Sequence, residues 1–149
     1  VEGPIKKEKA SFILAGRRSY VDVLAKPFTD VFDNGAALYF YDLTAKANWD
    51  IDDRNRVYLS GYFGRDVFKF DERQGFDWGN QTGTIRWNHL FSDKLFSNFT
   101  GVFSDYDYGF SFGDDASDTF DWSSNIKTYD FKPEFNYFLN DNYMGNKTW

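Results

Sequence analysis

The chain has 149 residues, of which 22% are aromatic and 27% are charged, and its net charge is -6. An acidic chain without a basic patch does not suit nucleic acid, and a chain without cysteine has neither disulfides nor thiolate metal sites. No run of 18 apolar residues is present, so no membrane helix is expected. This does not exclude a membrane β-barrel, because barrel strands alternate in polarity and score poorly on hydropathy.

Apolar residues recur at every second position along most of the chain, which predicts β-strands. We expect the tail of one strand at Val1–Pro4, followed by six long strands. The six are Ala10–Leu24, Ala36–Ile51, Arg56–Phe70, Gln81–Leu90, Leu95–Phe112 and Ile126–Phe138, and one more begins at Tyr143. Pro133 cannot donate to a strand ladder, so the sixth strand is expected to bulge there or to lie at an edge.

Short and long connections alternate along the chain. Short turns are expected at Lys6–Lys9, Asp50–Asn55, Phe91–Lys94 and Leu139–Asn142, and longer loops at Lys26–Gly35, Asp71–Gly79 and Gly113–Ser124. This layout is typical of an outer-membrane barrel. The strands are longer than the roughly five or six residues usual in soluble sheets, and they are long enough to provide the roughly 9–11 tilted residues that cross a bilayer. The predicted fold class is therefore all-β, with antiparallel up-and-down transmembrane strands. The alternative is a large soluble β-sandwich with one wet face on each sheet.

Residue parity divides the side chains of these strands into two sets. The polar set is expected to line a wet lumen, and it consists of Arg17, Asp42, Lys46, Thr84, Arg86, Asn88, Asp130, Lys132 and Glu134. The apolar set, with aromatic girdles at both ends, is expected to face lipid, and it includes Tyr39, Tyr41, Trp49, Ile85, Trp87, Phe99, Phe103 and Tyr137. Arg18 falls on the lipid side and would have to snorkel there.

Residues suited to catalysis are scarce, and we expect neither enzyme activity nor a cofactor. His89 is the only histidine and shares the face of Trp87 beside a turn. Asp130 and Glu134 lie about 13 Å apart at strand rise, which exceeds the roughly 5–9.5 Å between paired glycosidase carboxylates. We take the glycosylation sequons that begin at Asn80, Asn98 and Asn146 as chance matches.

The long loops hold the remaining candidates. Aromatic side chains beside Asp and Asn suit ring stacking against a ligand or contact with a partner, and they are Phe76, Trp78, Phe120 and Trp122. Packing of loop against loop, or an aromatic collar at the membrane surface, is the alternative. The acidic stretch 113–121 offers weak calcium candidates at Asp114, Asp115 and Asp118, but its spacing does not match an EF-hand. We therefore predict no metal site.

Three segments of the chain resemble a known protein family. EGPIKKEKASFILAGRRSYVDVLAKPF (2–28), YFYDLTAKANWDIDDRNRVYLSGYFGRDVF (39–68) and WGNQTGTIRWNHLFSDKLFSN (78–98) are similar, in this order, to barrel segments of Bacteroidetes TonB-dependent receptors. This group includes the SusC-like transporters. The resemblance extends over most of residues 2–112 and weakens over 113–149. It implies a 22-stranded barrel in the bacterial outer membrane, of which these residues supply about seven or eight strands.

The resemblance also implies a function and partners. Such a receptor imports a scarce ligand, for example a glycan or a ferric siderophore, with energy delivered by TonB. The implied partners are outer-membrane lipid, the plug domain, the remaining barrel, TonB and a SusD-like surface lipoprotein. Residues 1–149 hold neither plug nor TonB box, so we expect them to be one part of a larger receptor barrel. Two alternatives remain: a secreted β-sandwich that binds glycans, and an outer-membrane scaffold subunit without transport.

Overall fold

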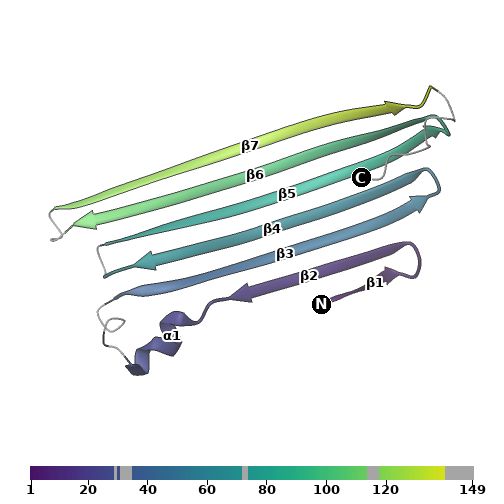
Figure 1. The fold of residues 1–149 in the computed structure, drawn as a ribbon. Coiled ribbons are helices and arrows are strands. Elements are labelled where there is room, and N and C mark those ends of the chain that lie inside the picture. The colour runs from purple at the N-terminus through teal and green to yellow at the C-terminus, as the bar shows by residue number, and fades with distance from the viewer. Residues whose placement is uncertain (29, 31–34, 72–73, 114–117, 140–149) are drawn as a thin grey trace.

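The protein is described by a computed structural model that covers residues 1–28, 30, 35–71, 74–113 and 118–139. Its architecture is one antiparallel sheet of seven strands in sequence order (Figure 1). The strands are β1 (Glu2–Lys6), β2 (Ala10–Arg18), β3 (Ala37–Asp52), β4 (Asn55–Lys69), β5 (Gly75–Ser92), β6 (Leu95–Gly113) and β7 (Thr119–Tyr137). A short helix, α1 (Val21–Ala25), and a 3-10 turn, η1 (Lys26–Phe28), follow β2. The all-β prediction is confirmed, and the sheet does not close on itself.

Three predicted strand boundaries are wrong. The strand expected over Ala10–Leu24 ends at Arg18, where the Ser19 hydroxyl accepts a bond from the Val21 amide at 3.5 Å and α1 begins. Pro27 follows α1 and disfavours further helix in the residue before it. β5 begins at Gly75 instead of Gln81, and β7 begins at Thr119 instead of Ile126. The predicted loops Asp71–Gly79 and Gly113–Ser124 are correspondingly shorter.

The other predicted boundaries agree with the structure within one residue at most ends. β3, β4 and β6 match their predicted strands closely, and β1 confirms the early strand at Val1–Pro4. The tight turn between β1 and β2 places Glu8 at a φ of 60°, and the Lys9 amide donates to the Lys6 carbonyl at 3.0 Å. The strand expected from Tyr143 and most of the turn Leu139–Asn142 lie outside the described residues.

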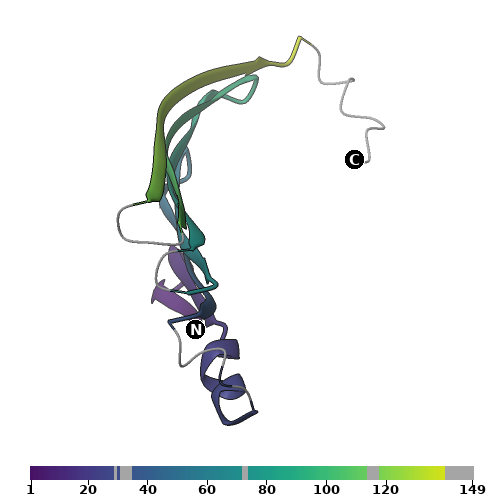
Figure 2. The same ribbon diagram turned by 90° about the vertical axis from the view of Figure 1, so that its left-hand side faces the viewer.

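The direction of the peptide groups determines which side chains point to the concave side of the sheet. When an L-residue in a strand points its side chain at the viewer and the chain runs upward, its N–H and C=O groups point right. The Asp50 amide donates to Lys9, so the even-numbered residues of β3 turn their peptide groups toward β2. In Figure 1 β3 runs from left to right and β2 lies below it. Below is the right-hand side for an observer who follows the chain, so the even-numbered side chains of β3 face the viewer. That side is the hollow of the curved sheet in Figure 2.

We call this concave surface the inner face and the convex surface the outer face. Because antiparallel partners share a face, the register extends the assignment across the sheet. The inner face carries the odd-numbered residues of β2 and the even-numbered residues of β3 to β7. The outer face carries the others.

Pro133 lies in the edge strand β7. Of the two alternatives predicted for this strand, a bulge or an edge position, the second is confirmed. The register from β6 to β7 is unbroken, and Pro133 pairs with Phe99 without a bulge. The Phe138 amide donates to Lys94 of the β5–β6 turn, so the even-numbered residues of β7 bond toward β6. Pro133 is odd-numbered, so its missing donor faces away from β6 and costs no bond in the β6–β7 ladder.

Candidate functional site

The structure brings each predicted set of strand residues onto one face. All nine residues predicted to face a lumen lie on the inner face, and all eight predicted to face lipid lie on the outer face. One register row of the inner face joins Lys46, Ser60, Thr84, Val102 and Asp130 across five strands. Parity holds although three strand ends were mispredicted, because a change in length does not move a side chain to the other face.

The outer face carries an apolar band of constant height. On four strands the outer face changes from mainly apolar to polar or charged at nearly the same distance from the short-turn end. Arg65 is ten residues after the start of β4 and Asp105 ten after the start of β6, whereas Gln81 is eleven before the end of β5 and Lys127 ten before the end of β7. Between these positions and the turns the outer face is mainly aromatic, aliphatic or glycine, with the exceptions Asn55 at the turn, His89 and the fully buried Ser97.

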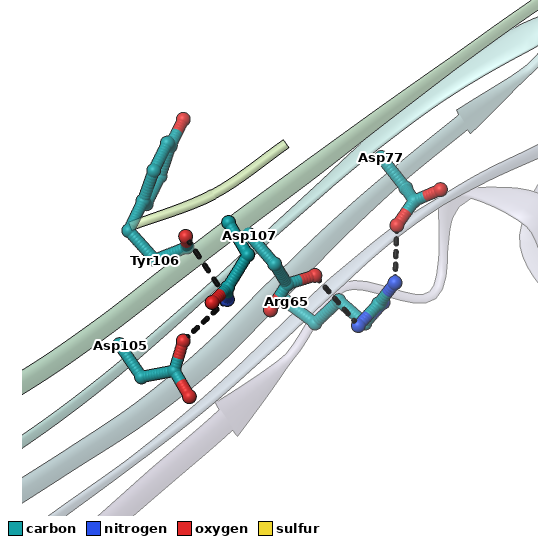
Figure 3. A network of polar contacts seen from close by, with 6 residues as sticks. Arg65, Asp77, Asp105, Tyr106 and Asp107 are labelled. Carbon is teal, nitrogen blue, oxygen red and sulfur yellow. Dashed lines mark hydrogen bonds and ion pairs between the residues drawn. The ribbon is translucent and has the colours of Figure 1, made fainter. Parts of the chain in front are cut away.

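A network of charged side chains follows the band on the side of the long loops. The Arg65 guanidinium donates to Asp77 and, at 3.3 Å, to Asp107 (Figure 3). Gly79 pairs with both Arg65 and Asp107, and a Cβ there would lie 2.8 Å from the Asp107 carboxylate. The glycine therefore leaves room for the network. The predicted sites did not include these residues, although a glycine between charged residues of one parity was a signal for them.

The inner face is charged over the stretch of the strands whose outer face carries the apolar band. Arg17 is paired with Asp42, and Arg56 with Asp50. Within the described ranges, Lys46 and Arg86 have no carboxylate at ion-pair distance. Both line a hollow of about 380 Å³ together with the polar residues Ser11, Asn48, Tyr58, Ser60 and Thr84 and the apolar residues Phe12, Ile13, Ala47 and Leu59. The two cations make this part of the inner face suited to an anionic group.

Toward the long loops the inner face becomes aromatic. We define the aromatic surface as Phe68, Phe76, Trp78, Tyr106, Tyr108, Phe110, Phe112, Phe120 and Trp122. Phe76 stacks between Phe68, at 5.1 Å between ring centroids, and Trp78, at 5.6 Å. Trp122 meets the Tyr108 ring edge-on at 5.1 Å. One register row joins Phe68, Phe76, Phe110 and Trp122 across four strands.

The placement of these aromatic residues on loops was wrong. Phe76 and Trp78 lie in β5, and Phe120 and Trp122 lie in β7. The residues at 106, 108, 110 and 112 were missed as site candidates, although four aromatic side chains at period two were a signal for them. The two faces thus exchange character along the strands. Near the short turns the outer face is apolar and the inner face polar, and near the long loops the outer face is charged and the inner face aromatic.

A polar cluster anchors the end of the band beside the short turns. The Trp87 indole donates to the Asn55 side-chain carbonyl at 3.0 Å, and His89 Nδ1 lies 2.7 Å from the same oxygen. The Asn55 amide in turn donates to both carboxylate oxygens of Asp52, at 2.9 and 3.0 Å. His89 is thus part of a structural cluster, and its geometry includes no nucleophile.

Acidification is expected to loosen this turn through Asp52. Bonds from the Arg54 amide and the Asn55 side chain lower the pKa of Asp52 below its ordinary 3.8. The resulting stabilisation is present above pH 3.8 and is lost as the pH falls through the lower, folded pKa. We expect the indole N–H resonance of Trp87 to shift as the pH is lowered below about 4, and not in Asp52→Asn, whose side chain does not titrate. An equal shift in Asp52→Asn contradicts the assignment.

The predicted absence of a metal site stays a prediction. Asp114 and Asp115 lie outside the described residues, and Asp118 is exposed. Within the described part of the chain, no three His, Asp or Glu residues gather as a metal site requires.

Comparison with protein-family models, with curated proteins and with solved structures finds no match to this chain. None of the helices in the described ranges is long and apolar enough to cross a membrane.

Proposed function

We propose that the sheet is a section of an outer-membrane β-barrel wall, with its outer face in lipid and its inner face on the lumen. The band on the outer face carries this proposal. Ten or eleven residues separate the short-turn ends of four strands from the positions where their outer face becomes polar or charged. That length agrees with the roughly 9–11 tilted residues that span a bilayer and with an apolar band about 25 Å tall.

The orientation follows from the two ends of the strands. The short turns lie on the periplasmic side, and the long loops lie outside the cell. The charged network of Arg65, Asp77 and Asp107 then lies just above the membrane, and the aromatic surface lines the outer mouth of the lumen. In the described part of the chain the outer edge of β7 has no partner strand, and in lipid it requires one. The remaining barrel strands supply it.

Transport is the function that this wall supports best. The resemblance to TonB-dependent receptors, together with a polar lumen that carries unpaired Lys46 and Arg86, favours ligand import into the periplasm with energy from TonB. The wall contributes by positioning: the aromatic surface holds the ligand at the mouth, and the cationic hollow contacts the plug or the ligand. No covalent step is involved. A SusD-like lipoprotein above the long loops is the proposed surface partner.

Fractionation of the native full-length protein tests this proposal. We expect it in the outer-membrane fraction, with an unboiled band that migrates differently from the boiled one in a detergent gel. Uptake of its ligand should require TonB. A protein that stays soluble without detergent overturns the membrane assignment and favours a glycan-binding sandwich. A membrane-embedded protein without TonB-dependent uptake favours a scaffold subunit.

A further inference from the structure

An unpaired cation lies on the outer face where β2 ends. Arg18 is the last residue of β2 and is in register with Tyr41. Its guanidinium carbon lies 5.4 Å from the Tyr20 ring centroid and 5.8 Å from that of Tyr39. No carboxylate in the described ranges lies at ion-pair distance from it. The two rings therefore hold the guanidinium without neutralising it, and its N–H donors remain available to an external anion.

An apolar hollow lies on the same face, nearer the short turns. It measures about 280 Å³, and its outer-face lining consists of Phe12, Leu14, Ala45, Ala47, Leu59 and Gly61. In the register rows Phe12–Ala47–Leu59 and Leu14–Ala45–Gly61, the small residues Ala45, Ala47 and Gly61 leave a low floor beside the larger Phe12, Leu14 and Leu59. A second hollow of about 330 Å³ shares Ala47 and Leu59 and continues along Trp49 and Val57. Since these side chains offer almost no polar atoms, an occupant must be apolar.

The spacing between cation and hollow fits within one membrane leaflet. Leu14 lies four residues before Arg18 on one strand, about 13 Å away at strand rise. Half of a hydrocarbon core is about 15 Å thick. Between the two, Gly16 carries no side chain, and a Cβ there would lie 3.4 Å from Leu43 Cδ1. An apolar chain can therefore run from Arg18 to the hollow without meeting a side chain of β2.

We propose that this surface binds a phosphate-bearing lipid of the leaflet at the long-loop end, with its phosphate on Arg18 and one acyl chain in the hollow. This inference rests on the proposed function, because it requires the outer face to lie in the membrane. Two independent features select the occupant. The unneutralised guanidinium selects an anionic head, and the narrow small-residue floor selects a flexible chain instead of a flat protein surface.

Spin-labelled lipids test the site in the full-length protein. The protein is placed in phosphatidylcholine nanodiscs that contain spin-labelled phosphatidylglycerol or spin-labelled phosphatidylcholine, and the immobilised fraction is measured by electron paramagnetic resonance. Wild type should immobilise the anionic label preferentially. Arg18→Gln should lower this preference about fivefold, and Arg18→Lys should retain most of it. Arg17→Gln is the matched control, since Arg17 faces inward on Asp42 and should leave the preference unchanged.

A second pair of variants tests the hollow. Gly61→Leu fills the floor and should reduce the immobilised fraction of both labels. Gly83 is paired directly with Gly61 on the outer face, has open space at its Cβ position and does not line the hollow, so Gly83→Leu should leave the fraction unchanged. Equal effects of Arg17→Gln and Arg18→Gln, or of Gly61→Leu and Gly83→Leu, overturn the lipid site alone. Failure of the wild-type protein to enter nanodiscs overturns the proposed function as well.

Discussion

Replacing Ile85 with arginine is expected to cost about 2–4 kcal/mol of folding free energy in lipid vesicles, which is the range for a cation at the lipid-facing midplane of a barrel. Ile85 lies on the outer face, inside the band between Gln81 and the end of β5, and is 52% exposed. In the proposed orientation its side chain projects into the hydrocarbon core. Urea titration of the full-length protein in vesicles, followed by tryptophan fluorescence, measures the loss.

Thr84 supplies the matched control one residue away. Its side chain lies on the inner face, in register with Ser60 and Val102, and lines the hollow that contains Lys46 and Arg86. Thr84→Arg should change the folding free energy little, because the added cation stays in water. Equal costs at positions 84 and 85 contradict a lipid-facing outer surface. A loss at Thr84 alone would reverse the assignment of the two faces.

The sequence sufficed to predict the strands and their faces, because both depend on local alternation. Parity assigned Lys46 and Arg86 to one face and Ile85 and Trp87 to the other without any knowledge of the register. Curvature, strand order and the height of the band depend on long-range pairing, to which single-strand patterns are insensitive. The charged network of Arg65 shows this limit, since its partners are 12 and 42 residues away in the chain.

The ends of β5 and β7 were mispredicted for a different reason. Residues 75–80 and 119–125 also alternate, but with aromatic side chains on the face that is polar elsewhere, and with Gly and Asp residues typical of loops. Their strand structure depends on cross-strand partners such as Phe68 for Phe76 and Phe110 for Trp122. The aromatic surface was missed for the same reason, because its residues come from four strands and meet only when those strands pair.

Replacing Phe76 with alanine is expected to lower the free energy of unfolding by about 2–4 kcal/mol, because a half-buried ring is lost together with two stacked partners. Phe76 stacks with Phe68 and Trp78 and has a third ring, Phe70, at 6.4 Å. Phe76→Leu should recover much of the loss by restoring apolar volume. Urea titration in vesicles measures both variants, and a change below about 1 kcal/mol in Phe76→Ala contradicts this packing role.

Trp122 separates packing from ligand contact within the same aromatic surface. It is 50% exposed and within the described ranges has one ring contact, to Tyr108, so Trp122→Ala should cost only about 0.5–1.5 kcal/mol of stability. If the surface holds the ligand at the mouth of the lumen, that variant should still weaken binding, measured by fluorescence titration with soluble oligosaccharides and ferric siderophores. A ligand found for the wild type that binds Trp122→Ala equally well would remove Trp122 from the ligand contacts and leave it a packing role beside Tyr108. The ligand contacts would then have to come from the other exposed rings of this surface, such as Phe112 and Phe120 at 55% and 61% exposure, or from outside it.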